Sequence, residues 1–434
     1  MLKYLMLKIA CVFSFRESSW ISCQKIVFNL HKAYEQIPGV QLLNYDYGLE
    51  TWSGAIIQLS NDIFEANPDA IVIMDHKPHP FHFLKFLLPK YAGRPKPLLI
   101  FHVFGDFTLY YSYWTKLGKL LEGFPVQFIV ASGRQKSLID KLLSPPLYSY
   151  VCPFPVKEED FSFKPQERIA QRKEWGVKEN ETVFTFTGRI SRQKRTHLLL
   201  KAFNELLIRE NNPDCRLYIY GQADHVGDNF LNLWENENEY FRKIHRQLME
   251  LPESTRARIH FMGNVPNSEL RSVYAGADYL VNLSVHNDED YGMSVAEAQM
   301  SGLPSILTDW GGLAAFEHPE MPEATRYLKV TIGQKSKIIS FEETVNALTA
   351  ALKSPKKVER EKLIDLSRKK FSVNAATERL KWILGQKTVP FVSFDEIVET
   401  IARRELLEQR VYLTKDQKIS TIYRKLYSSY VRNP

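Results

Sequence analysis

The sequence is poor in cysteine and lacks a long apolar run. Its 434 residues contain four cysteines, with neither a CxxC pair nor the spacing of a metal site: Cys11, Cys23, Cys152 and Cys215. This distribution argues against a disulfide framework or a zinc centre and favours isolated thiols in a reducing compartment. We therefore expect a cytoplasmic protein, with the inner face of the membrane as the alternative location.

The N-terminal segment is the one place where a targeting signal could be suspected. Lys8 interrupts its apolar residues, and no small-residue cleavage site follows. Residues 7–15 (LKIACVFSF) instead have the composition of a first strand. No run elsewhere is long enough to span a bilayer, so any membrane contact is expected to be peripheral.

The charge balance is mildly basic. Lys and Arg number 57 against 50 Asp and Glu, a net charge of +7, and 44% of the residues are apolar. This excess suits anionic substrates, nucleic acid or an anionic membrane surface. No nucleic-acid motif accompanies it, so we expect substrate phosphates rather than nucleic acid as the partner. The length fits two domains with an extension.

Apolar, strand-like runs alternate with amphipathic stretches along most of the chain. The pattern is interrupted around Pro153, Pro155 and Pro165 and restarts at residues 181–188. Apolar runs separated by helical stretches form a parallel sheet covered on both faces. The sequence therefore predicts an α/β protein with two Rossmann-like domains, and ligands at the carboxyl ends of their strands.

The segment EDYGMSVAE, from Glu289 to Glu297, carries the clearest chemistry. It follows a strand-like run, and MSVAEAQM reads as a helix that Gly302 and Pro304 end. Gly292 would lie at the turn, where a ligand can approach the backbone and the first amides of the helix can face an anion. The two carboxylates can each accept hydrogen bonds from sugar hydroxyls. The plainer interpretation is a solvated loop acid and an ordinary helix glutamate.

A second segment, GRISRQK, follows the strand-like run 181–188. Gly188 ends the run, and Arg189 and Lys194 precede a Leu-rich helix. An Arg fork and a Lys charge beside a helix N-terminus are suited to a diphosphate, although basic residues after a strand are often only solvated.

Taken together, these segments resemble the retaining GT-B glycosyltransferases of glycosyltransferase family 4. The resemblance covers residues 181–386 and includes the order of the strand-like runs that end near Gly221 and Gly263. It implies two Rossmann-like domains facing across a deep cleft: residues 1–160 for the acceptor, 161–370 for the nucleotide-sugar donor, a crossover helix at 371–386, and a helical extension at 387–434 without a family counterpart.

The resemblance also implies roles for individual residues. Arg189 and Lys194 would grip the donor diphosphate, Glu297 the ribose and Glu289 the transferred sugar, which makes a metal ion or other cofactor unnecessary. The remaining donor-binding candidates lie in turns after strands: Gly188, Asn264, Val265, Tyr291, Gly292, Met293 and Ser294. Gly311 and Gly312 are expected to be structural.

The first domain departs from the family pattern. SFRESSW follows its first strand without a glycine, so Arg16 and Ser18 would have to replace backbone contacts to phosphate. His102 and Asp106 are the candidates to complete the catalytic site, with Asp75 and His76 as a competing pair. A histidine in an apolar strand is also commonly a core residue. His79 and His82 suggest a metal only if further ligands join them.

The predicted function is a retaining, metal-independent glycosyltransferase that uses a nucleotide-diphosphate sugar. Aromatic and basic stretches at residues 79–96 and 110–124 suit a glycan or lipid-linked acceptor at a membrane face, and also suit helices packed on a sheet. An apolar stripe near the C-terminus could touch a membrane or another subunit, or pack on its own domain: Ile422, Tyr423, Leu426, Tyr427 and Tyr430. A nucleotide-sugar epimerase, a sugar phosphorylase or a non-catalytic scaffold is the alternative, because fold alone does not exclude them.

Overall fold

The computed structural model divides the chain into two compact units. It describes residues 6–13, 21–46, 53–74, 80–104, 111–144, 148–223, 237–287, 289–333, 337–354, 358–408 and 417–432. Unit 1 comprises residues 1–155 and 372–429, and unit 2 comprises residues 156–371 and 430–434. The chain therefore passes from one unit to the other after residues 155, 371 and 429.

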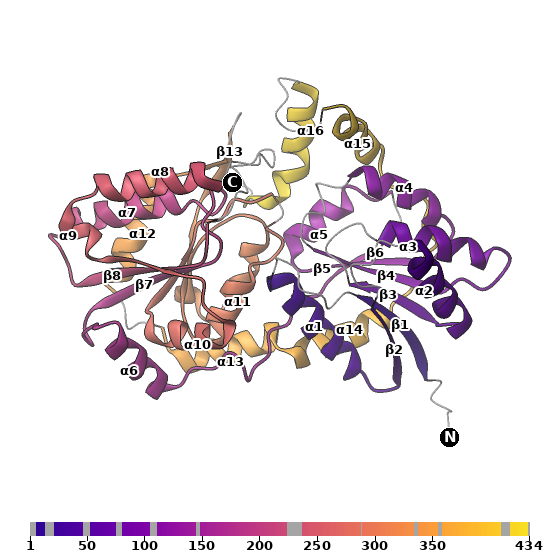
Figure 1. The fold of residues 1–434 in the computed structure, drawn as a ribbon, viewed down its shortest axis with the longest axis horizontal. Helices are drawn as coiled ribbons and strands as arrows, with labels where there is room; N and C mark the ends of the chain where they lie inside the picture. The colour runs from indigo at the N-terminus through magenta and orange to yellow at the C-terminus, as the bar shows by residue number, and fades with distance from the viewer. Residues whose placement is uncertain are drawn as a thin grey trace. The chain divides into compact units, whose positions relative to one another are not determined.

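Unit 1 is a six-stranded parallel sheet with the strand order β2-β1-β3-β4-β5-β6 (Figure 1). Its strands are β1 (Leu7–Phe13), β2 (Val40–Asp46), β3 (Ala70–Met74), β4 (Leu98–Val103), β5 (Val126–Val130) and β6 (Tyr148–Val151). β3 is buried along its whole length, as a strand covered on both faces must be. β2 is a partly exposed edge strand with polar residues, which is why no apolar run marks it in the sequence.

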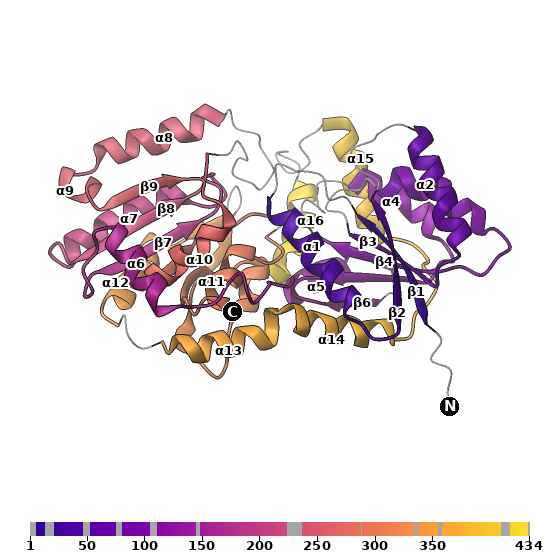
Figure 2. The same cartoon turned by 60° about the horizontal axis from the view of Figure 1, so that its bottom comes forward.

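The helices of unit 1 come from both ends of the chain. The N-terminal ones are α1 (Ile21–Glu35), α2 (Ser53–Ala66), α3 (Pro80–Leu87), α4 (Tyr111–Leu121) and α5 (Gly133–Asp140), with a 3-10 turn at Leu88–Tyr91. The C-terminal ones are α14 (Val373–Leu384), α15 (Glu396–Glu408) and α16 (Gln417–Tyr427). α14 packs beside α1, and Thr377 donates a hydrogen bond to the carbonyl of Ala33 (3.1 Å) (Figure 2).

Unit 2 is a second six-stranded parallel sheet, with the order β12-β11-β10-β7-β8-β9. Its strands are β7 (Thr182–Thr187), β8 (Cys215–Tyr220), β9 (Ile259–Gly263), β10 (Tyr279–Asn282), β11 (Ser305–Thr308) and β12 (Thr325–Leu328). A hairpin of β13 (Val330–Ile332) and β14 (Lys337–Ile339) follows. Numbered within the unit and read from β9, this is the Rossmann order 3-2-1-4-5-6. Successive strands are added on one side of β7 up to β9 and then on its other side from β10 onward.

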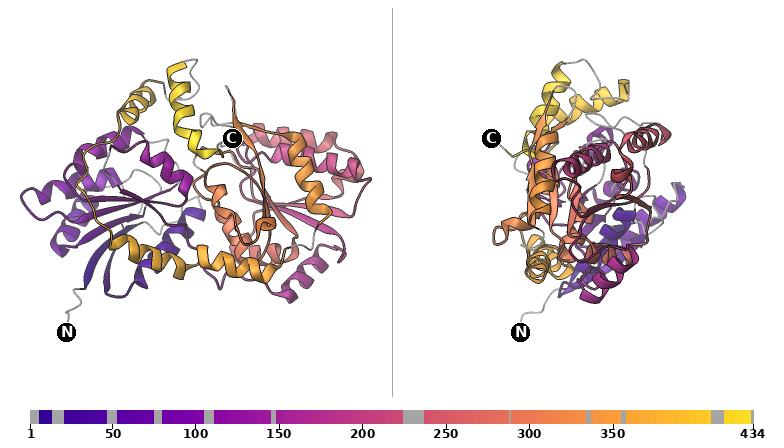
Figure 3. Two further views of the ribbon diagram at one scale, coloured as in Figure 1. Left: turned by 180° about the vertical axis from the view of Figure 1, so that it is seen from behind. Right: turned by 90° about the vertical axis from the view of Figure 1, so that its left-hand side faces the viewer.

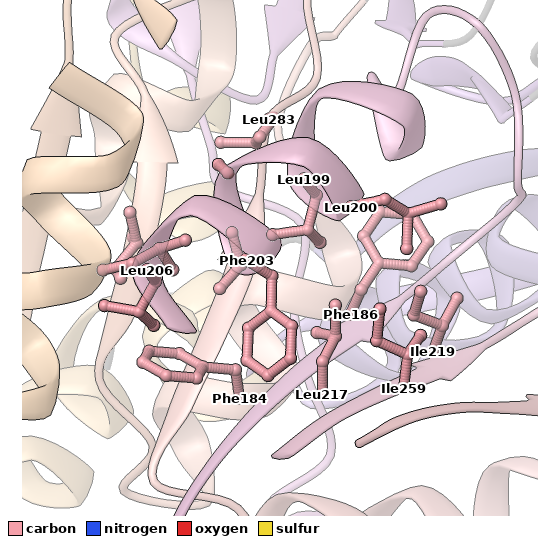
Figure 4. Packing of buried hydrophobic residues seen from close by; sticks show 14 of the residues in the cluster. Phe184, Phe186, Leu199, Leu200, Phe203, Leu206, Leu217, Ile219, Ile259 and Leu283 are labelled. Carbon is pink, nitrogen blue, oxygen red and sulfur yellow. The ribbon is translucent and has the colours of Figure 1, made fainter. Parts of the chain in front are cut away.

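Helices cover both faces of this sheet (Figure 3). One group consists of α7 (Thr196–Arg209), α8 (Glu237–Glu250), α9 (Glu253–Arg256) and α12 (Phe341–Leu352). The other group consists of α6 (Pro165–Glu174), α10 (Asn267–Gly276), α11 (Met293–Met300) and α13 (Arg360–Phe371). Figure 4 shows Phe203 and Leu206 of α7 packed over Phe184 and Leu217 of the sheet, all fully buried. This core fixes β7, whose carboxyl end carries Gly188 and Arg189. The predicted α/β fold with two Rossmann-like sheets is confirmed.

The C-terminal extension is part of unit 1 up to residue 429. α15 packs on α4, where a Cβ on Gly118 would lie 2.9 Å from the ring of Phe394. The apolar stripe of α16 is buried, with Tyr423, Leu426 and Tyr427 at 0% exposure. Packing within the protein, rather than contact with a membrane, is therefore the role of this stripe. No helix in the described ranges is long and apolar enough to cross a bilayer.

Candidate active site

The site lies where the Rossmann order of unit 2 reverses, after β7 and β10. Open α/β sheets bind ligands at such switch points, because adjacent loops there diverge to opposite faces. The loop after β7 carries Arg189 and Lys194, and the loop after β10 carries Glu289. The amide of Val285 donates to the carbonyl of Gln193 (3.0 Å), so the two loops contact each other through the backbone.

Glycines let the strand ends approach closely. Gly188, with φ +145°, follows β7, and Gly221, with φ +134°, follows β8. A Cβ on Gly221 would lie 1.9 Å from the carbonyl oxygen of Gly188, so only glycine fits. The amide of Gly221 also donates to the carbonyl of Gly263 (2.8 Å) at the end of β9. Asn264 and Val265 follow that glycine at the same carboxyl edge, with Asn264 exposed.

Lys194 and Glu289 meet directly, although 95 residues separate them. The ammonium lies 2.7 Å from Oε2 of Glu289, and the side chains are 16% and 7% exposed. Ser284 donates a second hydrogen bond to the same oxygen. Two donors therefore hold one oxygen of Glu289 in a fixed direction.

His286, three residues before Glu289, is buried near several cations. Burial lowers the pKa of His286 well below its ordinary value, and the charges of Arg189, Lys194 and Lys337 lower it further. His286 is therefore neutral near pH 7. Arg189 lies on the same loop as Lys194, and both charges act on His286.

Lys337 is a buried cation that the sequence did not reveal. It is 3% exposed and donates to the carbonyl of Val285 and to Oδ1 of Asn287, both at 2.5 Å. Its ammonium also lies 4.7 Å from the ring centre of Trp310. β14 thus secures the loop that leads to Glu289.

Glu297 lies inside α11, one turn after Gly292. The hydroxyl of Tyr274 donates to Oε2 of Glu297 (3.5 Å) and lies 3.0 Å from Oγ1 of Thr187, the last residue of β7. Burial raises the pKa of Tyr274, and the charge of Glu297 raises it further, so this tyrosine remains a donor. Glu297 therefore borders the same strand end as Arg189.

The start of α11 provides backbone donors. Gly292, with φ +117°, precedes the helix, and its carbonyl accepts from the amides of Val295 (2.9 Å) and Ala296 (3.1 Å). The amides of Met293 and Ser294, in half-buried residues, come before the first of these helical bonds. They can donate to an anion in front of the helix.

Gly311 and Gly312 support the site from behind, as predicted for structural glycines. The amide of Gly312 donates to the carbonyl of Glu289 (2.7 Å). A Cβ on Gly312 would lie 1.9 Å from the carbonyl oxygen of Asp290, and one on Gly311 would lie 2.6 Å from that of Glu289.

Two predicted site residues have other surroundings. Tyr291 is 2% exposed and packs on the rings of Phe316 (4.9 Å) and Phe371 (5.9 Å), so its side chain belongs to the core and only its backbone is near the turn. His102 is 3% exposed, and its Nε2 lies 2.9 Å from the hydroxyl of Tyr34. Burial lowers the pKa of His102 to about 3.

The placement of His102 argues against the catalytic role predicted for it. It is a core histidine that is neutral at pH 7, which is the alternative that its apolar strand allowed. Asp106, Asp75, His76, His79, Arg16 and Ser18 lie outside the described residues. Among the side chains described, no three of His, Cys, Asp or Glu gather as metal ligands would.

Several site residues were missed because they come from elsewhere in the chain or look ordinary in sequence. Ser284 and His286 lie in the polar run after β10, a signal that could have been used. Lys337 and Tyr274 have no local signal, because only tertiary contacts bring them to the site.

Comparison with known proteins agrees with this geometry. Residues 167–329 match the family model of the group 1 glycosyl transferases. This match agrees with the resemblance of the motifs to glycosyltransferases.

Relatives match over a little more than a third of the chain. An uncharacterized glycosyltransferase of Methanocaldococcus jannaschii is 28% identical over 167 residues, which are 38% of this chain and 36% of the relative. The D-inositol 3-phosphate glycosyltransferase of Nocardia farcinica is 31% identical over 35% of this chain and 31% of its own. The chain thus matches about a third of the length of these relatives.

Solved structures extend the likeness to both units. Anabaena HepE in complex with UDP and glucose has a TM-score of 0.62 at 15% identity, covering 88% of this chain and 100% of HepE. The lipopolysaccharide outer core galactosyltransferase WaaB has a TM-score of 0.59, covering 87% of this chain and 99% of WaaB. At this identity the likeness concerns the fold, which is GT-B.

Proposed function

We propose that the protein is a retaining glycosyltransferase that moves a sugar from a nucleotide-diphosphate sugar to an acceptor. The observation that carries this proposal is the meeting of Lys194 with Glu289 at the switch point of unit 2. Arg189 lies on the same loop as Lys194, and α11 begins shortly after Glu289. The donor of HepE, whose structure holds UDP and glucose, makes UDP-glucose the first donor to test.

The site matches the charges of such a transfer. Breaking the bond between the anomeric carbon and the diphosphate leaves negative charge on the leaving group, which fixed cations and amides stabilise without reorganisation. Arg189, Lys194 and the amides of Met293 and Ser294 would do this, and so we propose a metal-independent reaction. Glu289 would accept hydrogen bonds from the transferred sugar, and Glu297 from the ribose.

We further propose that the acceptor is a glycan or a lipid-linked glycan, bound by unit 1, and that the protein works in the cytoplasm. Lys85 of α3 and Lys116 of α4 are exposed, while Phe83 and Trp114 are buried on the same helices. This leaves a basic outer face suited to an anionic acceptor or membrane surface. Co-sedimentation with anionic vesicles tests the membrane contact, and binding to neutral vesicles only would contradict it.

The function is tested by incubating the protein with UDP-, GDP- and ADP-sugars and a panel of acceptors, followed by mass detection of product and of free nucleotide. Glu289→Gln and Arg189→Ala should remove turnover and leave the fold intact. Arg209→Ala is the matched control, because Arg209 is a surface arginine of the same unit that pairs with Glu205 and Glu342. It should retain activity.

The same assay separates the alternatives. Interconversion of the donor without nucleotide release would indicate an epimerase, and dependence on orthophosphate would indicate a phosphorylase. Failure of any nucleotide to bind in calorimetry would indicate a scaffold. Product with inverted anomeric configuration would refute retention alone.

A further inference from the structure

The last described residues of the chain dock behind the candidate active site. Residues 430–432 belong to unit 2, whereas the preceding α16 belongs to unit 1. Tyr430 is 0% exposed, and its ring meets that of Trp310 edge to face at 5.4 Å. A Cβ on Gly311 would lie 3.0 Å from two atoms of the Tyr430 ring, so the ring rests on the backbone of Gly311.

Arg432 fastens the same segment by charge. Its Nε lies 3.2 Å from Oδ2 of Asp309, and its Nη2 lies 3.2 Å from Oε2 of Glu317. Its guanidinium also lies 5.6 Å from the ring centre of Tyr327. Asp309 is 8% exposed, so one of these carboxylates is nearly buried.

The segment that receives these contacts, residues 309–312, holds the loop of Glu289. The indole of Trp310 donates to the carbonyl of His286 (2.5 Å), and the amide of Gly312 donates to the carbonyl of Glu289 (2.7 Å). Tyr430 and Arg432 therefore touch the residues that hold the site.

The chain just before residue 430 is fixed as well. Nζ of Lys141 donates to the carbonyls of Lys425 and Leu426 (2.9 Å each) and lies 3.1 Å from Oγ of Ser428. A cation at the carbonyl end of a helix is a favourable arrangement, because the last carbonyls lack helical partners. Lys141 thus anchors the end of α16 within unit 1.

We propose that Tyr430 and Arg432 are positioning residues for Glu289. Tyr430 acts through Trp310 and Gly311, and Arg432 acts through Asp309, the residue before Trp310. On this account the last described residues of the chain, 430–432, are part of the support of the candidate site. The effect on turnover rests on the proposed function, whereas the effect on the loop does not.

The experiment compares four variants of the full chain with the wild type, together with a truncation after Ser429. Arg432→Ala and Tyr430→Ala remove the contacts, and Tyr430→Phe keeps the ring. Arg403→Ala is the matched control, because Arg403 is a 78% exposed arginine of the same extension, paired with Glu399. Circular dichroism and gel filtration check that each variant is folded.

The first readout is hydrogen exchange of peptides that cover residues 284–297 and 305–317, without substrate. Arg432→Ala, Tyr430→Ala and the truncation should accelerate exchange there, while Tyr430→Phe and Arg403→Ala should match the wild type. The second readout is kcat/KM for the donor, which should fall by about 10- to 100-fold in the truncation, since small misplacements of site groups cost that much.

The two readouts separate the proposed function from the positioning role of Tyr430 and Arg432. If the wild type transfers no sugar, the proposed function fails, and hydrogen exchange alone then decides the positioning role. If the wild type is active, the positioning role is overturned when the truncated protein shows the same hydrogen exchange or the same kcat/KM as the wild type. Equal effects of Tyr430→Phe and Tyr430→Ala would also overturn it, because the ring contact would then be irrelevant.

Discussion

Gly312→Ala is a sharp test of how the site is supported. The added Cβ would lie 1.9 Å from the carbonyl oxygen of Asp290 and 2.1 Å from its carbon, where ordinary contact begins at 3.4 Å. The two backbone segments must separate by about 1.5 Å for the oxygen to reach ordinary contact. The φ of Gly312 lies outside the left-handed region, so the obstacle is space and not backbone conformation.

The loss in the free energy of unfolding comes from overpacking and from a stretched hydrogen bond. Overpacking of this kind costs about 1–3 kcal/mol, and the hydrogen bond from Gly312 to Glu289, which the separation would stretch, contributes about 1 kcal/mol. A loss of about 2–4 kcal/mol in the free energy of unfolding lowers the melting temperature by about 5–15 °C for a unit of this size. The same movement displaces Glu289, so turnover should fall by about 100-fold.

The assays are thermal unfolding, which measures stability, and sugar transfer from the donor, which measures turnover, with Gly133→Ala as the control. Nothing lies within 4 Å of a Cβ on Gly133, which is an exposed residue at the start of α5. That variant should be as stable as the wild type or more stable by up to about 1 kcal/mol. If Gly312→Ala melts within about 2 °C of the wild type and keeps its turnover, the reasoning is refuted.

Three further changes have expected outcomes. Glu297→Gln should weaken UDP binding by about 10-fold or more in calorimetry, because a charged acceptor for the ribose is lost; unchanged affinity would exclude that role. Lys337→Met should raise the pKa of His286, measured by NMR titration, because one of the charges that lower it is removed. His102→Gln should make the free energy of unfolding decrease less as the pH is lowered. Since the pKa of His102 is lowered from 6.5 to about 3, the unfolded chain binds a proton between these values that the folded one does not. Stability should therefore fall as pH drops through that window, by up to about 1.4 kcal/mol per pH unit from this residue, as urea unfolding at several pH values would show.

The sequence by itself determined the parts of the fold that depend on local pattern. The buried strands β1, β3, β4, β7 and β8 appear as apolar runs, because a strand covered on both faces needs apolar residues throughout. α11 begins and ends at Met293 and Met300, as MSVAEAQM predicts, because Gly292 and Gly302 bound it. The motif from Glu289 to Glu297 predicted the candidate site for the same reason: its residues are neighbours in the chain.

Tertiary structure alone decided which distant groups join that motif and which do not. Lys337 and Tyr430 reach the site from late segments of the chain, and a sequence does not state which buried lysine or tyrosine packs where. His102 is a candidate site residue by the family resemblance, but its ring nitrogen contacts the hydroxyl of Tyr34 in the core. The edge strands β2 and β12 carry polar residues and left no apolar run. In each case the deciding quantity is the burial and pairing of a side chain, which only the folded chain sets.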